Sequence, residues 1–331
     1  MSPSSAGRSR WRNSSWLPCR NRGLVTQRTT VTRQERPHGH HQDPTPHAFA
    51  LSLVATAAVA TAAASAALLI PLGQAASAHT VSAAATASHH APKPTIVLVH
   101  GAWANTSSWD GVISRLHALG YTVYAPPNTL MGLTFDDAYL ADFLHSISGP
   151  IVLVGHSYGG AVITNAATGD NQVKALVYVD AFMPAEGESV GQLVAAEPGS
   201  CVVAKDPTTI FNLVPYPGAP AGAVDAYLKQ SVFPDCIANG LPAAEQQQLA
   251  VTQLPLTTLA LSQTSGVPAW KTIPSWAVVG TEDHTIPPAE LMFMAERAHA
   301  HITTVKAPHV SMISNPGVVT SVILQAVHAT S

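Results

Sequence analysis

From Thr95 onward, short apolar runs alternate with longer segments in which apolar residues recur at helical spacing. The short runs predict buried strands at 95–99, 122–125, 151–154, 175–179, 275–279 and 302–305. The longer segments predict helices at 109–119, 136–147, 159–167, 288–298 and 316–329. Because strands and helices alternate, we expect one α/β domain over 95–331, with a mostly parallel, doubly wound sheet covered by helices on both faces.

One segment, at about 183–268, breaks this rhythm. It is richer in Pro, Gln and Ala than the segments around it, yet it keeps many large apolar residues, which argues against disorder. We therefore expect a mainly helical insertion that forms a lid over the carboxyl ends of the strands, where open α/β sheets bind ligands.

The first 78 residues have a different composition. Eight arginines stand there against two acidic residues, and an apolar, Ala-rich run follows at 48–72. Ala76-Ser77-Ala78 fits the small-x-small cleavage site of a secretory signal peptide. We therefore expect cleavage near Ala78 and a secreted or extracytoplasmic protein; the alternative is that 48–72 remains as a membrane anchor.

This interpretation divides the N-terminal part into three pieces. They are a basic leader at 1–47, a signal segment at 48–78 and a linker at 79–94. The leader is expected either to be disordered or to result from a start codon placed too far upstream. The histidines of the leader have no scaffold and do not predict a metal site.

The charge and the cysteines of the exported part, residues 79–331, indicate which partners and which cross-link to expect. Residues 79–331 carry 17 acidic against eight basic side chains, which argues against nucleic acid as a partner. After cleavage, Cys201 and Cys236 are the two remaining cysteines, because Cys19 lies in the leader. An even pair in an oxidising compartment predicts one disulfide, with two buried free thiols as the alternative.

The most informative motif directly follows the predicted strand at 151–154. Gly155-His156-Ser157-Tyr158-Gly159 is a Gly-x-Ser-x-Gly sequence that leads into a predicted helix. This pattern is typical of a nucleophile elbow, a tight turn that exposes a serine hydroxyl at a helix N-terminus. We therefore expect Ser157 to be a catalytic nucleophile.

A serine hydroxyl needs a base and an acid that orients the base. His309 follows the last predicted strand, and Asp283 follows the strand before it, so both are expected at the same edge of the sheet. The order Ser157, Asp283, His309 is that of α/β-hydrolases. The alternatives are Glu282 or Asp180 as the acid, and His156 or His284 as the base.

The developing oxyanion of acyl transfer needs two N–H donors. We expect one from the backbone of Tyr158 and the other from Ala102, in the His-Gly-Ala-Trp turn after the first strand. Trp103 and Phe182 are expected to line the substrate pocket, although either could equally belong to the core.

These motifs together resemble the α/β-hydrolase superfamily over Thr95 to the C-terminus. Trp109, shortly after His-Gly, and Thr-Glu-Asp-x-x-Ile-Pro make the chain similar to the plant methyl-esterase and hydroxynitrile-lyase group and its bacterial esterase relatives. The cyanohydrin-cleaving members have a threonine and a lysine at the positions of Gly101 and Val310, so the resemblance implies hydrolysis here. A serine nucleophile also argues against the epoxide hydrolases and haloalkane dehalogenases.

The sequence therefore predicts an exported serine carboxylic-ester hydrolase that acts on a small apolar ester through an acyl-enzyme. The predicted chemistry requires no metal and no organic cofactor. Contact with a membrane is expected only if the signal segment is retained, and the oligomeric state is left open. The alternatives are amide, lactone or C–C hydrolysis, or perhydrolysis, by the same triad, and a non-catalytic small-molecule binder on the same fold.

Overall fold

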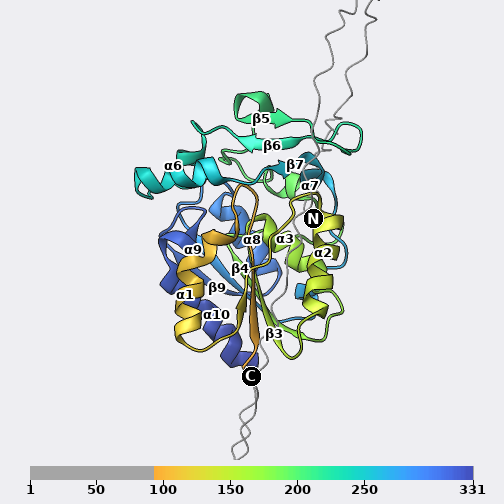
Figure 1. Cartoon of the computed structure of the whole chain (residues 1–331), viewed down its shortest axis with the longest axis vertical. Coiled ribbons are helices and arrows are strands. Elements are labelled where there is room, and N and C mark those ends of the chain that lie inside the picture. The colour runs from red at the N-terminus through yellow and green to blue at the C-terminus, as the bar shows by residue number, and fades with distance from the viewer. Residues whose placement is uncertain (1–92, 331) are drawn as a thin grey trace, which may run out of the picture. The chain divides into compact units, whose positions relative to one another are not determined.

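Figure 1 shows the computed structural model, which describes residues 93–330. The basic leader expected at 1–47 and the signal segment expected at 48–78 lie outside the described residues, as does most of the expected linker. Cys19 and the leader histidines lie there as well.

The centre of the fold is a six-stranded sheet in the order β2-β1-β3-β4-β8-β9, with every neighbouring pair parallel. The middle strands are rich in Val, Ile, Leu and Ala and are almost entirely buried, as expected where helices cover both faces. The strands are β1 (Thr95–Val99), β2 (Val123–Tyr124), β3 (Ile151–His156), β4 (Val173–Val179), β8 (Ser275–Gly280) and β9 (His301–Val305).

Helices cover the two faces of this sheet. In Figure 1, α1, α9 and α10 lie on one side and α2 and α3 on the other. Their bounds are α1 (Asp110–Ala118), α2 (Leu133–His145), α3 (Tyr158–Ala166), α8 (Pro288–Arg297), α9 (Ser311–Ser314) and α10 (Pro316–Thr330), and a 3₁₀ turn (Thr106–Trp109) precedes α1. The doubly wound α/β architecture expected from the sequence is confirmed.

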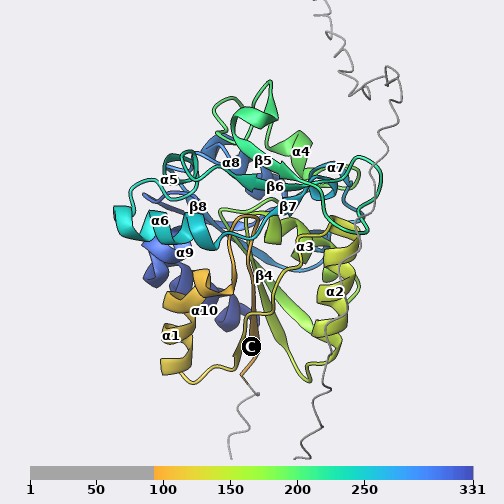
Figure 2. The same cartoon turned by 45° about the horizontal axis from the view of Figure 1, so that its top comes forward.

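The insertion between β4 and β8 covers the end of the sheet at which the strands finish (Figures 1 and 2). It contains an antiparallel sheet of β5, β6 and β7, so the prediction of a mainly helical insertion missed a sheet. Its elements are α4 (Val190–Leu193), β5 (Phe211–Val214), β6 (Asp225–Leu228), α5 (Phe233–Cys236), α6 (Ala243–Thr252), β7 (Leu256–Thr257) and α7 (Thr258–Ser262), with a 3₁₀ turn (Pro207–Thr209) before β5 and another (Ala269–Lys271) before β8.

The missed sheet has a local signal in the sequence. Burial alternates along β6, and the Pro- and Gly-rich segment 215–222 separates it from β5. This segment is longer than the roughly two to five residues that are typical of a hairpin loop, so the signal for a hairpin is weak. The runs are only four residues long, which is why the apolar pattern alone did not distinguish them from helix.

Cys201 and Cys236 are joined by a disulfide, with their Cα atoms 5.6 Å apart. The bond links two parts of the insertion that are 35 residues apart in sequence. It lies close to the loop after β8, because the Cys201 N–H donates to the His284 carbonyl at 2.9 Å. The insertion is therefore fastened both to itself and to the end of the central sheet.

Candidate active site

Ser157 lies at the sharp turn between β3 and α3. Its φ of 53° and ψ of −124° place a non-glycine residue in the left-handed half of backbone space, where side chains are strained. The turn closes because Gly155 and Gly159 lack side chains. A Cβ on Gly155 would lie 2.6 Å from the Gly159 carbonyl oxygen, and one on Gly159 would lie 2.6 Å from the Val99 carbonyl oxygen.

Three side chains from three separate strand ends meet at this turn. His309 Nε2 lies 2.8 Å from Ser157 Oγ, and His309 Nδ1 lies 2.7 Å from Asp283 Oδ2. The other carboxylate oxygen of Asp283 accepts the Thr285 and Ile286 N–H groups at 2.7 and 2.9 Å. The structure thus brings the predicted nucleophile, base and acid into one continuous chain of hydrogen bonds.

The alternative acids and bases have other partners. Glu282 is exposed and lies 3.5 Å from Lys306, while the His284 ring contacts the Asp235 carbonyl oxygen at 2.8 Å. His156 is buried, and its Nε2 donates to the His309 carbonyl oxygen at 2.9 Å. The fourth alternative, Asp180, is buried close to Asp283 but accepts backbone N–H groups.

Burial controls the ionisation of this site, because Ser157, Asp283 and His309 are all at most 3% exposed. Loss of hydration lowers the pKa of His309 to about 3. It also raises the pKa of Asp283 to about 8, although the two backbone N–H donors oppose that rise. Burial thus disfavours the charged form of each group. When the ionised Asp283 accepts a hydrogen bond from the His309 Nδ1–H, Nε2 of the neutral ring is an acceptor that faces Ser157 Oγ.

The loop after β1 packs directly against Ser157. A Cβ on Gly101 would lie only 2.5 Å from the Ser157 Cβ, so only glycine fits there. The Ala102 N–H has no acceptor among residues 93–330, and the Tyr158 N–H belongs to the first turn of α3, where amides lack intrahelical acceptors. These are the two backbone donors expected to bind an oxyanion, and that role stays a prediction.

His100 and Asn128 fix the shape of this loop, and sequence reasoning missed their contact. His100 Nε2 accepts the Asn128 N–H at 3.0 Å, so its proton resides on Nδ1 and is donated to the Gly101 carbonyl at 2.9 Å. The Asn128 side chain also donates to the His100 carbonyl at 2.9 Å. No local pattern predicts this pair, because its partners are 28 residues apart.

A second missed contact anchors α3. The buried Tyr158 hydroxyl donates to Asp136 Oδ2 at 2.7 Å, and Asp136 Oδ1 accepts the Met131 N–H at 3.0 Å. The first turn of α3, which carries one expected oxyanion donor, is thereby held against the start of α2. Asp136 also accepts a very short hydrogen bond from the Thr129 hydroxyl.

The two aromatic residues expected in the substrate pocket are both buried. Trp103 Nε1 donates to the Ala226 carbonyl at 2.9 Å, and its ring stacks on Phe211 with centroids 5.4 Å apart. Trp103 thus ties the loop after β1 to the insertion. The Phe182 N–H donates to the Ser157 carbonyl at 3.2 Å. A pocket-lining role for these two rings stays a prediction.

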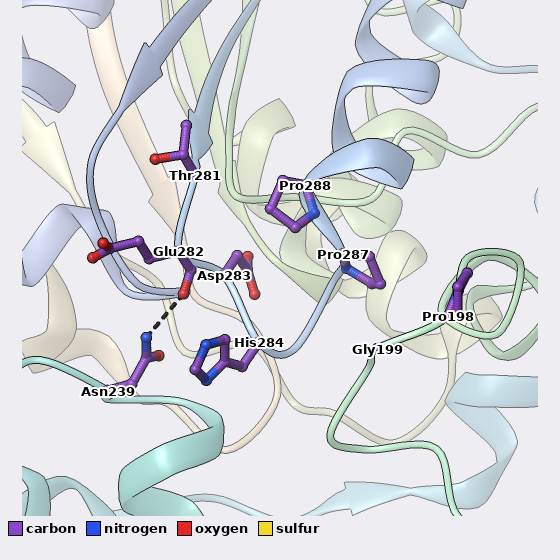
Figure 3. Close-up of a pocket in the computed structure, with 9 residues that line it drawn as sticks. All are labelled: Pro198, Gly199, Asn239, Thr281, Glu282, Asp283, His284, Pro287 and Pro288. Atoms are coloured by element: carbon purple, nitrogen blue, oxygen red, sulfur yellow. Dashed lines mark hydrogen bonds between the residues drawn. The ribbon is translucent and has the colours of Figure 1, made fainter.

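A pocket of about 560 Å³ lies between the insertion and the loop after β8 (Figure 3). It borders Asp283 but neither Ser157 nor His309. At one side of it, Asn239 donates to the Glu282 carbonyl at 2.9 Å. The lining residues are Pro198, Gly199, Asn239, Thr281, Glu282, Asp283, His284, Pro287 and Pro288.

The described part of the chain has neither a cluster of metal ligands nor a helix that could span a membrane. Within 93–330, no group of three or more His, Cys, Asp or Glu side chains is placed to hold a metal ion. Within the same range, every helix is too short or too polar to cross a bilayer.

Comparison with known proteins gives matches over most of the described region. The model of the alpha/beta hydrolase family matches residues 96–322. Alpha/beta hydrolase nvfD of Aspergillus novofumigatus (strain IBT 16806) is 28% identical over 256 residues, covering 71% of this chain and 96% of that protein. A carbendazim hydrolyzing esterase of Nocardioides sp. (strain SG-4G) is 34% identical over 111 residues, covering 30% of this chain and 46% of that protein.

Solved structures agree with the fold. An extracellular alpha/beta-hydrolase from a Paenibacillus species, described as sharing structural and functional homology with Tobacco Salicylic Acid Binding Protein 2, has a TM-score of 0.57. It is 22% identical to this chain, and the match covers 70% of this chain and 98% of that one. The arrangement of strands and helices expected from the sequence is thus that of solved α/β-hydrolases.

Proposed function

Because the chain belongs to the alpha/beta hydrolase family, we propose that it is a serine carboxylic-ester hydrolase that works through an acyl-enzyme. The observation that carries this proposal is the hydrogen-bonded chain from Ser157 Oγ through His309 to Asp283. It supplies a nucleophile, a base and an orienting acid within transfer distance of one another.

In the first half-reaction, Ser157 Oγ attacks the carbonyl carbon of the ester while His309 Nε2 takes its proton. The carbonyl oxygen becomes an oxyanion that accepts the Ala102 and Tyr158 N–H groups. When the carbon–oxygen bond to the alcohol breaks, the protonated His309 donates its proton to the departing oxygen. The products are a free alcohol and an ester of Ser157.

In the second half-reaction, a water molecule gives a proton to His309 Nε2 and its oxygen attacks the acyl carbon. The bond to Ser157 Oγ breaks, and His309 returns the proton to that oxygen. A carboxylic acid is released and the resting site is restored. Asp283 holds the ring and stabilises the imidazolium that forms in both halves.

The buried position of Ser157 beneath the insertion supports a small, apolar ester as substrate. Aromatic rings lie around the neighbouring loop, including Trp103 and Phe211. The names of two partial relatives, a carbendazim hydrolyzing esterase and a pyrethroid hydrolase, support the reaction class. Neither name identifies the substrate of this chain.

We also propose that the protein is exported and that residues 1–78 are removed near Ala78. The support is the basic start, the apolar run 48–72 and the small-x-small site. N-terminal sequencing of the protein recovered from culture medium tests this. A mature chain that begins near residue 79 supports export, whereas intact protein in the membrane fraction would identify 48–72 as an anchor.

The reaction is tested by hydrolysis of p-nitrophenyl esters of increasing acyl length. We expect Ser157→Ala to lower kcat by about 10⁶-fold, because the attacking oxygen is removed. Ser321→Ala, at an exposed position on α10, is the matched control and should behave like the wild type. A folded wild-type protein without Ser157-dependent ester turnover would overturn the esterase assignment and direct the search to amide, lactone or C–C substrates, or to ligand binding.

A further inference from the structure

Asp180 is a buried carboxyl group beside the catalytic residues that the proposed reaction does not use. It directly follows β4, is fully buried, and has a φ of 45°, which is strained for a residue other than glycine. Its own N–H donates to the Val278 carbonyl at 2.9 Å, which continues the pairing of β4 with β8. Burying an acidic group costs free energy of folding unless its oxygens have hydrogen-bond partners, so the partners of Asp180 indicate what it does.

The carboxylate of Asp180 bridges the two loops that carry the acid and the base. Oδ1 accepts the Gly280 N–H at 2.7 Å, and Gly280 ends β8 three residues before Asp283. Oδ2 accepts the Ser311 N–H at 3.0 Å, two residues after His309. The Asp180 carboxylate therefore connects the backbone of the loop that carries Asp283 to the backbone of the loop that carries His309.

The same segment also holds the nucleophile. The Val179 carbonyl accepts the Ser157 N–H at 3.2 Å, and the Phe182 N–H donates to the Ser157 carbonyl at 3.2 Å. With the two bonds of Asp180, residues 179–182 contact the nucleophile turn, the acid loop and the base loop. A displacement of this segment would shift all three side chains relative to one another.

Packing leaves little freedom at this junction. The loops after β8 and β9 are paired directly as far as the Glu282 N–H, which donates to the Ala307 carbonyl at 3.0 Å. A Cβ on Gly280 would lie 2.8 Å from the Ala307 carbonyl oxygen and 3.0 Å from Asp180 Oδ1. The Asp180 carboxylate thus packs between the loop after β8 and the loop after β9. Burial, followed by the nearby Asp283, raises the pKa of Asp180 well above its usual value, which is the electrostatic cost of this placement.

We propose that Asp180 is a positioning residue for catalysis: through the Gly280 and Ser311 N–H groups it aligns Asp283 with His309 and keeps His309 in reach of Ser157. The inference rests on the proposed function, because it assigns Asp180 a part in that same reaction. Catalytic geometry is sensitive enough for this to matter, since a misplacement of about 1 Å can cost about 100-fold in rate.

The first test is Asp180→Asn in the full-length protein. Asparagine keeps the shape but places an NH₂ group where one oxygen accepted an N–H, so one loop loses its partner. We expect kcat to fall by about 10- to 100-fold with KM changed less than about twofold. Tyr178→Phe is the matched control: it removes a buried hydrogen bond to Thr164, 2.9 Å long, from the same strand and should leave kcat unchanged.

A second pair of variants tests the bridge without altering the carboxylate. Ser311→Pro replaces the N–H that Asp180 accepts with a ring methylene that faces the carboxylate, which breaks the bridge, and Ser311 is the first residue of α9, a position that suits the backbone of proline. Ser311→Ala keeps that N–H. We expect Ser311→Pro to lower kcat as Asp180→Asn does, and Ser311→Ala, which loses only the hydroxyl next to Asp180, to lower it less. This pair decides the question if Asp180→Asn does not fold.

A readout independent of turnover is the proton NMR resonance of the His309 Nδ1–H, which we expect to be strongly deshielded by its short hydrogen bond to Asp283. We expect it to shift or broaden in Asp180→Asn and to be unchanged in Tyr178→Phe. A folded Asp180→Asn with wild-type kcat and an unchanged resonance would overturn the proposal, as would equal losses in Ser311→Pro and Ser311→Ala. Failure of the esterase proposal looks different: the wild type then lacks Ser157-dependent turnover, and the resonance still tests Asp180.

Discussion

Removing the disulfide should cost a large, calculable part of the stability of this protein. The perturbation is the double variant Cys201→Ser/Cys236→Ser, which leaves no unpaired cysteine of this pair. The bond closes a loop whose ends are 35 residues apart. Loop-closure entropy for a loop of this length corresponds to about 4 kcal/mol, because the unfolded chain regains the freedom that the cross-link removed.

For a domain of this size, a loss of about 4 kcal/mol lowers Tm by roughly 10 °C. Thermal unfolding followed by circular dichroism measures this directly, with the wild type scanned with and without a reducing agent. Reduced wild type and the double variant should unfold at the same temperature. A change of less than about 2 °C would refute the entropy argument, because it would mean that the loop is restricted equally in the unfolded chain.

The disulfide should also affect activity, because both cysteines contact the loop that carries Asp283. Cys201 donates its N–H to the His284 carbonyl, and the Thr285 hydroxyl donates to the Cys236 carbonyl, each at 2.9 Å. We expect the double variant to have a lower kcat even well below its Tm. Ser200→Ala is the control: it removes the 2.6 Å bond from Ser200 to the Thr285 carbonyl and leaves the cross-link intact. If the folded double variant retains full kcat, the contacts hold the loop without help from the disulfide.

Three further predictions concern ionisation and packing. The Asp283–His309 pair titrates as a unit, so kcat/KM should rise with pH through about 8 as the carboxyl loses its proton; an acid limb near 6.5 in a pH–rate profile would contradict the burial argument. Gly155→Ala should cost about 3 kcal/mol in urea unfolding, because its methyl group would press on a backbone carbonyl; a loss below about 1 kcal/mol would show that the turn can open. Burial acts to raise the pKa of Glu188, but the Arg297 guanidinium, 2.7 Å away, holds it below its usual value. Glu188→Gln should therefore lose about 1 kcal/mol at pH 7. The difference from the wild type should vanish as the pH falls and Glu188 is protonated; a difference that persists at low pH would mean that the pair does not act through its charge.

Much of the fold could be predicted because its signals are local. The four middle strands are apolar runs, three of which directly follow a proline, and their predicted positions lie within two residues of β1, β3, β4 and β8. The start of α2 was predicted at Asp136, whereas the helix begins at Leu133. The Asp136 carboxylate accepts the Met131 and Gly132 N–H groups, and this contact lets the helix start earlier than the apolar pattern indicates.

The order of Ser157, Asp283 and His309 at strand ends is also a property of the sequence, since parallel strands finish at one edge. Which of the adjacent residues Glu282 and Asp283 contacts His309 is decided by the tertiary structure. The loop turns Asp283 inward, where it accepts two backbone N–H groups, whereas Glu282 is exposed and lies near Lys306. Spacing along the chain contains no information on that rotation.

The sequence by itself determined the strands, the helices, the elbow and the chemical types at the strand ends, because these depend on period, propensity and residue identity within a few positions. Only the tertiary structure decided which side chains meet: Asp180 with Gly280 and Ser311, and His309 with Ser157, across 100 to 152 residues. Such contacts are set by how β4, β8 and β9 pack together, and that packing is a collective result of the whole core rather than of any one segment.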